Sequence, residues 1–319
     1  ATEYLSRFFA QTADLQDGYP LVASGREVRD ALAGMQNGGP VGLWIDDFVR
    51  KIDRFDRRIP SIRRHMRRKA STVPFAPPKI IIQALGKAQV MINDHVVSGS
   101  EWQTTTARDL FFYILAHPEG LTKESVGEVF WPDSTPAELK LRFKNNIYRL
   151  RRAAGKEAIT FDDEIYRFDR SLDYEYDVET FLRELDLARL NSDPEEKITH
   201  TQAALRAYGG SYLMDAEGVW ALDERERLQD LYLNAALMLA GIFVDRSQYA
   251  DALSCCQLAL EQDSCMESAH RLAMQSYHGI GNRVAVARQY ESCRQALLRE
   301  IGVEPSSQTQ ALYERLMRA

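Results

Sequence analysis

Cysteine is scarce in this 319-residue sequence, and the scarcity excludes two classes of protein. Four cysteines, of which Cys255 and Cys256 are adjacent, form neither a disulfide framework nor a C-x-x-C metal pair. The six histidines are scattered at spacings that match no set of metal ligands. We therefore expect reduced thiols, a cytoplasmic location and no metal site.

Long apolar runs and leader segments are lacking as well. No run approaches the roughly 18 apolar residues that cross a bilayer, so we expect no membrane association. The first ten residues have no basic stretch followed by an apolar one, which argues against a signal peptide. The chain begins with Ala1 rather than Met, which is typical of a processed protein or of a fragment of a longer one.

Catalytic motifs are missing too. Gly86 and Lys87 resemble the end of a phosphate-binding loop, but Ile81 stands where that loop needs a glycine. Neither G-x-S-x-G nor H-E-x-x-H occurs. We expect no enzyme activity, no catalytic residues and no cofactor.

Charge is present in abundance, and it is distributed unevenly. The net charge of −6 divides into +4 over residues 1–170 and −10 over residues 171–319. Two basic segments stand out: residues 50–69 have a net charge of +8 and residues 134–156 a net charge of +6. An acidic protein with two concentrated basic segments has places to bind a polyanion.

Proline and charge divide the chain into three parts. A proline-rich joint at residues 71–78 ends a helical N-terminal segment with a basic linker, residues 1–78. A second joint near residues 171–177 separates a domain of residues 79–171 from a domain of residues 172–319. Residues 1–78 could be the end of a larger sensor region.

The basic run at residues 50–69 follows an apolar stripe, Trp44, Phe48 and Ile52, on a helix that we expect Pro60 to break. It could bind DNA or RNA, or it could be a solvated helix and linker. We favour an interdomain helix with nonspecific attraction for phosphates at most.

Residues 79–171 combine short strands with helices. Residues 79–85 and 88–93 are β-prone, and residues 107–115 have helical periodicity. Thr122 can cap a short second helix. The third helix begins at a capping box, Thr135 with Glu138, and Gly155 can end it.

The buried stripe of that third helix comprises Leu139, Phe143, Ile147, Leu150 and Ala154. Residues 158–168 follow as a hairpin. This order predicts a winged helix-turn-helix domain with an N-terminal strand platform.

Residues 177–319 are expected to be entirely helical. Asp177 and Asp193 are typical helix-start residues, and one long apolar helix covers roughly residues 222–244. Residues 249–252 and 284–287 correspond at an offset of 35, close to the tetratricopeptide (TPR) period of about 34. The predicted fold is mainly α with a small α+β part: a helical N-terminal segment, a winged helix and a TPR-like repeat domain.

The third helix is the predicted DNA-binding element. With its apolar stripe inward, its basic and amide side chains lie on the sides and outside, and such a helix fits the major groove of B-DNA. Arg can pair with guanine, Asn with adenine, and Lys or Tyr with phosphates. Arg142 and Arg151 could instead pair with Asp133 or Glu128. Arg167 on the hairpin would reach the adjacent backbone, although the acidic tip at residues 162–164 opposes that contact. The candidate DNA-binding residues are Lys140, Arg142, Lys144, Asn145, Tyr148, Arg149, Arg152 and Arg167.

Residues 79–170 resemble the OmpR-type winged helix of SARP-type antibiotic-regulatory proteins. The stretches that match are residues 82–86 (IQALG), 129–133 (VFWPD), 147–152 (IYRLRR) and 165–168 (IYRF). Residues 177–319 resemble the bacterial transcriptional activator domain that follows it in that family. The matches there are residues 220–228 (WALDERERL), 267–274 (ESAHRLAM), 298–305 (LREIGVEP) and 312–316 (LYERL).

This resemblance implies a sequence-specific bacterial transcription regulator, usually an activator, that binds double-stranded promoter DNA, often as two copies on direct repeats. It also implies that the helical repeats regulate the winged helix or contact RNA polymerase, another subunit or an upstream sensor domain. The alternative is a TPR-type interaction scaffold whose winged helix binds protein rather than DNA.

Overall fold

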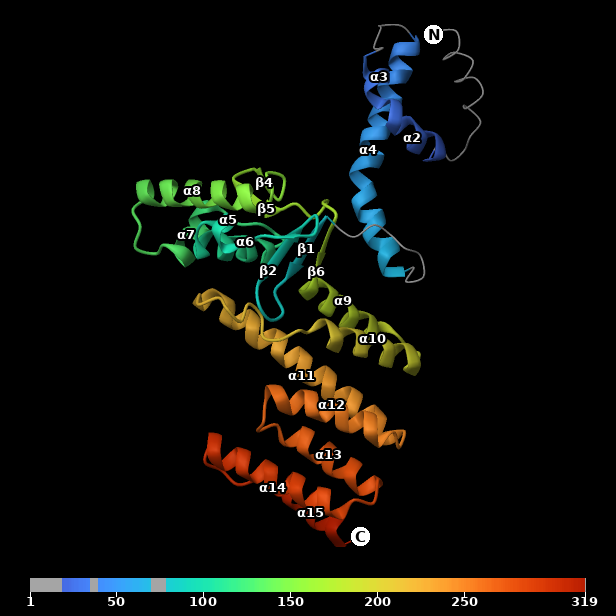
Figure 1. The fold of residues 1–319 in the computed structure, drawn as a ribbon, viewed down its shortest axis with the longest axis vertical. Coiled ribbons are helices and arrows are strands. Elements are labelled where there is room, and N and C mark those ends of the chain that lie inside the picture. The colour runs from blue at the N-terminus through green and yellow to red at the C-terminus, as the bar shows by residue number, and fades with distance from the viewer. Residues whose placement is uncertain (1–18, 35–39, 70–78, 319) are drawn as a thin grey trace.

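Three units follow one another along the chain in the computed structural model, which describes residues 19–34, 40–69 and 79–318 (Figure 1). They are an N-terminal helical unit (residues 19–34 and 40–69), an α/β unit (residues 79–176) and a C-terminal helical unit (residues 177–318). The fold is mostly helical with a small sheet part, as expected. The proline-rich joint at residues 71–78 lies outside the described residues.

The N-terminal helical unit packs three short elements against one long helix. Its elements are α2 (Tyr19–Gly25), η1 (Arg26–Val28), α3 (Arg29–Ala33) and α4 (Pro40–Lys69). The buried residues form a core of their own, separate from that of the other units: Val22, Leu32, Ile45, Phe48, Val49 and Ile52. The predicted apolar stripe on α4 is therefore confirmed as a packing face.

Pro60 does not break α4, contrary to the sequence prediction. Proline removes one N–H donor from the helix, so the Asp56 carbonyl loses its usual partner. Two features carry the helix past this point. The Ser61 hydroxyl donates to the Arg58 carbonyl at 2.8 Å, and the last turns are held by contacts of Arg64 and Arg67 with the α/β unit.

The α/β unit is built on a four-stranded sheet of order β3-β2-β1-β6. Strand β1 pairs antiparallel with β2, with Ile80 opposite Ile92, and parallel with β6, with Ile80 opposite Tyr174. Strand β6 lies beyond residue 171, where we expected the domain to end. The elements are β1 (Ile80–Gln83), β2 (Gln89–Ile92), β3 (His95–Val96), α5 (Gly99–Trp102), α6 (Thr105–Ala116), α7 (Lys123–Phe130), α8 (Pro136–Ala154), the hairpin β4 (Ile159–Asp162) with β5 (Ile165–Phe168), and β6 (Tyr174–Tyr176).

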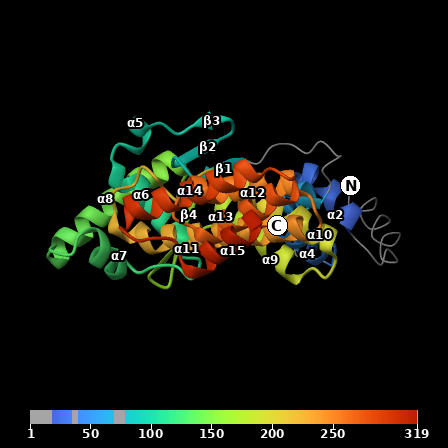
Figure 2. The same ribbon diagram turned by 90° about the horizontal axis from the view of Figure 1, so that it is seen from below.

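The C-terminal helical unit stacks antiparallel helices below the sheet (Figures 1 and 2). Helices α12 and α14 contain the two segments that correspond at an offset of 35. Helix α12 follows α11, and α14 follows α13. The elements are α9 (Asp177–Leu190), α10 (Pro194–Ala207), η2 (Val219–Ala221), α11 (Leu222–Asp245), α12 (Tyr249–Gln262), α13 (Glu267–Gly279), α14 (Arg283–Glu300) and α15 (Ser307–Arg318).

Among the described residues, one helix is long and apolar enough to cross a bilayer, contrary to the expectation from the sequence. The stretch Val219–Asp245 meets that criterion by length and composition, and 44% of the apolar 18-residue window within it is buried inside the structure. It contacts α10, α12 and α13. Burial against three neighbours is what a core helix of the stack shows, so the stretch is weak evidence for a membrane span.

A backbone junction joins the α/β unit to the C-terminal helical unit. Leu85, just after β1, forms a β-bridge with Tyr212, and the Leu213 N–H donates to the Ala84 carbonyl at 2.7 Å. The Asp177 carboxylate accepts from the N–H groups of Ala84 and Leu85 at 2.9 Å. A single hydrophobic core runs through both units, so they are packed as one body.

Candidate nucleic-acid interface

Helix α8 begins where the sequence predicted. The Thr135 hydroxyl accepts from the Glu138 N–H at 3.4 Å, and the Glu138 carboxylate accepts from the Thr135 N–H at 2.9 Å. Pro136 occupies the first turn, where its missing N–H costs nothing. Gly155 ends the helix with a φ of 99°, which favours glycine. Local sequence therefore fixes both ends of α8.

The apolar stripe seats α8 on the unit. Phe143, Ile147 and Leu150 are buried, and Leu139 fills the space left by Gly127, where a Cβ would lie 2.7 Å from its side chain. The buried Asn146 amide donates to the Arg142 carbonyl at 2.9 Å and its oxygen accepts from the Thr104 hydroxyl at 3.4 Å. These contacts fix which face of α8 points outward.

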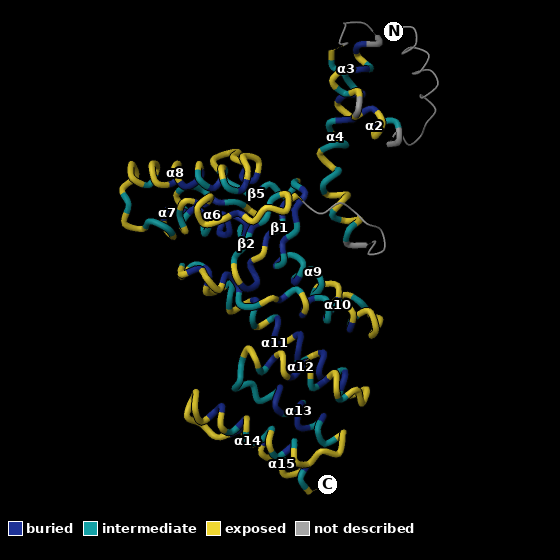
Figure 3. The backbone as a smooth tube through the Cα atoms, viewed as in Figure 1, coloured by how far each residue is buried: buried dark blue, intermediate teal, exposed yellow. Residues whose placement is uncertain are grey.

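The outward face of α8 carries four cations, the Asn145 amide and Tyr148, all of them exposed, and Figure 3 shows exposed stretches along this helix. Tyr148 is 65% exposed. Within the part of the chain that the structure describes, none of the four exposed cations forms an ion pair with a carboxylate. The exposed candidate residues are Lys140, Arg142, Lys144, Asn145, Tyr148 and Arg152. The α8 face (these six residues) is thus available to a polyanion.

Three arginines near this face bind the protein's own polar groups. The Arg149 Nε donates to the Gln103 side-chain oxygen at 3.2 Å, and the Arg167 Nε donates to the Glu119 carbonyl at 2.8 Å. Arg151 donates to the Ile159 carbonyl at 2.9 Å and so fixes the first strand of the hairpin. Among the described residues, neither Arg142 nor Arg151 forms the alternative ion pair with Asp133 or Glu128.

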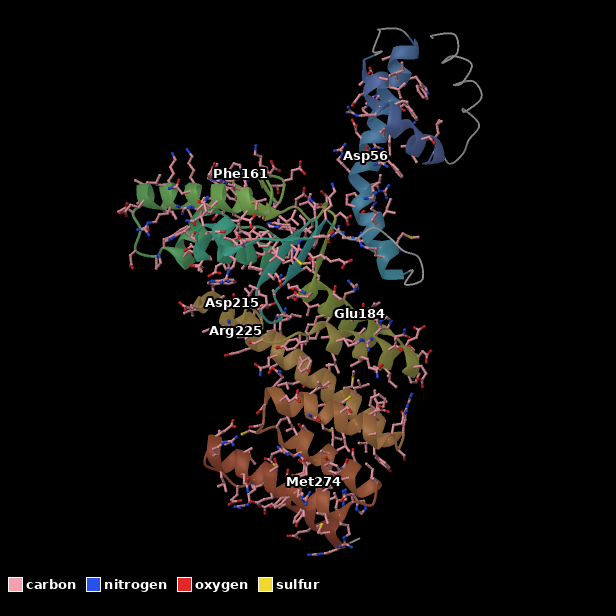
Figure 4. All side chains as sticks on the ribbon, viewed as in Figure 1. Asp56, Phe161, Glu184, Asp215, Arg225 and Met274 are labelled. Atoms are coloured by element: carbon pink, nitrogen blue, oxygen red, sulfur yellow. The ribbon has the colours of Figure 1, made fainter. Side chains whose placement is uncertain are left out.

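The β4–β5 hairpin stands beside α8 and has an acidic tip. Asp163 and Glu164 have φ values of 48° and 62°, so both central residues of the turn are left-handed. Asp162, Asp163 and Glu164 are all exposed, which opposes contact between the tip and a phosphate. Phe161, 54% exposed, lies at the outer edge of the hairpin (Figure 4).

A cleft of about 970 Å³ separates α8 from the hairpin. Its lining combines apolar and aromatic surface with a basic rim. The lining includes Lys123, Lys156, Phe161 and Tyr166, to which the sequence pattern assigns no binding role. Lys123, Phe161 and Tyr166 lie in elements that the sequence predicts, and Lys156 lies in the turn between α8 and β4. Only tertiary contact brings them to the same cleft. The lining residues used below are Lys140, Lys144, Tyr148, Arg152, Lys156 and Phe161.

The described residues offer little for redox or metal chemistry. Burial raises the pKa of Cys255 to about 11 and that of Cys256 to about 12, which keeps both thiols protonated and unreactive. Among the described residues, no group of three or more His, Cys, Asp or Glu side chains is placed to hold a metal ion.

Taken together, these contacts present a rigid helix with an unpaired basic and amide face. B-DNA has a major groove about 12 Å wide that admits an α-helix, and its base edges accept from or donate to Arg, Lys and Asn. Cations at the sides of such a helix can contact the phosphates that flank the groove. The residue roles on α8 remain predictions.

Comparison with known proteins shows where the similarity lies. Residues 176–317 match the family described as "Bacterial transcriptional activator domain". Regulatory protein AfsR of Streptomyces griseus is 23% identical over 195 residues, which cover 60% of this chain and 20% of AfsR. The chain thus spans about a fifth of the length of that relative.

A solved structure shares the fold. EmbR of Mycobacterium tuberculosis, in a complex with a low-affinity phosphopeptide, superposes with a TM-score of 0.60 at 17% sequence identity. The superposition covers 76% of this chain and 65% of the EmbR chain. At this identity the likeness concerns the fold.

Proposed function

We propose that this chain is a SARP-type transcription regulator that binds specific promoter DNA and activates transcription, with α8 as its recognition helix. The matching activator domain at residues 176–317 and the similarity to AfsR support the regulatory role. The observation that carries the DNA-binding part is the exposed and unpaired α8 face. In this proposal the α/β unit is a winged helix-turn-helix domain and the C-terminal unit is TPR-like.

The rest of the proposal concerns the domains and partners. The domain division at residues 1–78, 79–171 and 172–319 stays a proposal. Strand β6 lies just beyond residue 171 but pairs with strand β1 of the second domain. The C-terminal helices would contact RNA polymerase or an upstream sensor domain, and two copies would bind direct repeats. A bacterial cytoplasmic location follows from this role.

Two substitutions on the α8 face test the proposal and separate base reading from phosphate contact. Genomic fragments would first be selected with the purified chain, and gel shifts with a salt titration would follow. Asn145→Ala should cost about 1–3 kcal/mol on a selected fragment and far less on mixed-sequence DNA, because an amide reads adenine. Lys144→Ala should weaken binding to both and lower the salt slope by about 0.9, the value for one phosphate.

Arg288→Ala supplies the matched control, since Arg288 is exposed on α14, far from α8 in the chain. If selection enriches no motif and both α8 variants bind DNA like the unaltered chain, DNA binding by α8 is wrong. Capture of the same protein partner by the unaltered and variant chains would then favour the scaffold alternative.

A further inference from the structure

A second cleft, of about 750 Å³, lies between α4 and the α/β unit. One wall is the middle of α4, with Arg57, Pro60 and Arg63, and the other is the hairpin root and the start of β1. Gly155 and Lys156 line both this cleft and the cleft between α8 and the hairpin. The two clefts therefore adjoin at the C-terminal end of α8.

The α4 cleft has an excess of cations without carboxylate partners. Arg57, Arg63, Lys79 and Lys156 are all exposed, and none of them forms an ion pair within the described ranges.

The carboxylates of the same cleft are mostly engaged. Arg26 binds Asp56, Arg67 binds Asp173, and Asp169 accepts from the Ser171 N–H at 2.9 Å. Glu157 and Asp169 are the remaining acids, because a hydrogen bond from a backbone N–H leaves the charge of Asp169 in place. Four cations against two carboxylates still leave this cleft attractive to an anion.

The arginines of α4 divide between two roles. Arg64 donates to the Arg170 carbonyl and lies 4.4 Å from the centroid of the Tyr174 ring, while Arg67 binds Asp173 and Glu175. These two arginines hold α4 on the segment between β5 and β6. Arg57 donates to the Asp53 carbonyl of its own helix, and the nearby Asp53 carboxylate is bound by Arg29. Arg63 lines the cleft and forms no ion pair within the described residues.

The cations that form no ion pair within the described residues line the two adjoining clefts. They include Lys140, Lys144 and Arg152 on α8, Lys156 at the shared wall, and Lys79, Arg63 and Arg57. Figure 1 shows α4 beside the hairpin end of the α/β unit and extending beyond it. A duplex on α8 that continues past the hairpin would meet the α4 cations next.

We propose that α4 is a second phosphate-binding element, which contacts the backbone of the DNA that flanks the segment bound by α8. This inference rests on the proposed function, because α8 must place the duplex. Contacts of Arg and Lys with phosphates position a protein on DNA without reading its sequence. The role of α4 would therefore be to lengthen the bound segment and to set the orientation of the chain on it.

The test compares two mixed-sequence duplexes, one of about 16 bp, or one and a half turns, and one of about 40 bp. The double variant Arg57→Ala/Arg63→Ala should lose about tenfold in affinity on the long duplex only. Its salt slope there should fall by about 1.8, the value for two phosphates. Arg57→Lys/Arg63→Lys should keep the slope, because lysine binds phosphate as a point charge.

Two controls accompany the double variant. Arg206→Ala/Arg288→Ala removes two exposed arginines, one on α10 and one on α14. It should leave the affinity for both duplexes unchanged. Thermal unfolding should be the same for all variants, since Arg64 and Arg67 still hold α4.

The outcomes distinguish the inference from the proposal on which it rests. If the double variant binds the long duplex with an unchanged salt slope, or loses equal affinity for both duplexes, the flanking role of α4 is wrong. Lys144→Ala should still weaken binding to both lengths in that case. If Lys144→Ala changes the affinity for neither duplex, the proposal that α8 binds DNA is itself wrong.

Discussion

At the residue scale, His270 shows how the stack of helices uses a polar side chain in its interior. His270 is 2% exposed. Its Nε2 lies 3.0 Å from the Ser264 carbonyl and donates to it, and its Nδ1 accepts from the Gln289 amide at 2.7 Å. Both ring nitrogens are therefore satisfied in one neutral tautomer. A second proton on Nδ1 would face the N–H of Gln289.

This environment predicts a stability that depends on pH. Burial lowers the pKa of His270 below its usual value of 6.5. As the pH falls below about 6.5, the unfolded chain takes up the proton first, so the free energy of unfolding decreases with acidification. His270→Gln should flatten the pH dependence of the melting temperature between about pH 7 and pH 5. The exposed His65→Gln is the control, and equal slopes for all three proteins would contradict the role of His270.

At the element scale, the β4–β5 hairpin combines a tight turn with charges of the wrong sign for DNA. Asp163→Asn removes one negative charge, and asparagine tolerates a positive φ. We expect a several-fold gain in affinity for DNA at low salt, and the gain should shrink as salt screens the tip. Asp94→Asn is the matched control, because Asp94 occupies a similar left-handed turn in the β2–β3 connection. A gain of equal size in both variants would show a general charge effect instead.

The elements that could be predicted from the sequence are those with local signals at both ends. Helix α8 is the clearest case, since Thr135, Pro136 and Gly155 bound it in the sequence and in the structure. The face of α8 followed from helical spacing. The partner of Arg151 did not, because the nearest acceptor is a backbone carbonyl of β4, which no side-chain pattern reveals.

Contacts between segments that are distant along the chain could not be predicted from the sequence. Asp177 begins α9, as its residue type predicts, but its carboxylate also accepts from the N–H groups of Ala84 and Leu85, more than ninety positions earlier. Pro60 was expected to end a helix, but contacts made by Arg64 and Arg67 support its continuation. In both cases the deciding partner is close in space and remote along the chain.

At the scale of the whole molecule, the two junctions differ in kind. The α/β unit and the C-terminal unit share one hydrophobic core and backbone hydrogen bonds. The N-terminal unit has its own core and meets the α/β unit through Arg64 and Arg67. We therefore expect the first junction to be rigid and the second to open more readily.

Arg67→Ala tests the second junction. Asp173 has only 5% of its side chain exposed, so removing its cationic partner leaves a buried charge unpaired and should cost about 3 kcal/mol. Amide hydrogen exchange should quicken in the last turns of α4 while the amides of α8 stay protected. Arg58→Ala, exposed on the same helix, is the control. Unchanged exchange in α4 would show that other contacts hold this unit in place.

The separate core of the N-terminal unit has a consequence for evolution. Among the described residues, a replacement unit would have to match the contacts that two guanidinium groups of one helix make with Arg170, Asp173, Tyr174 and Glu175. A different input module could be grafted at this place by recombination without repacking the interior of its neighbour, whereas the stack below the sheet could be exchanged only together with the sheet itself.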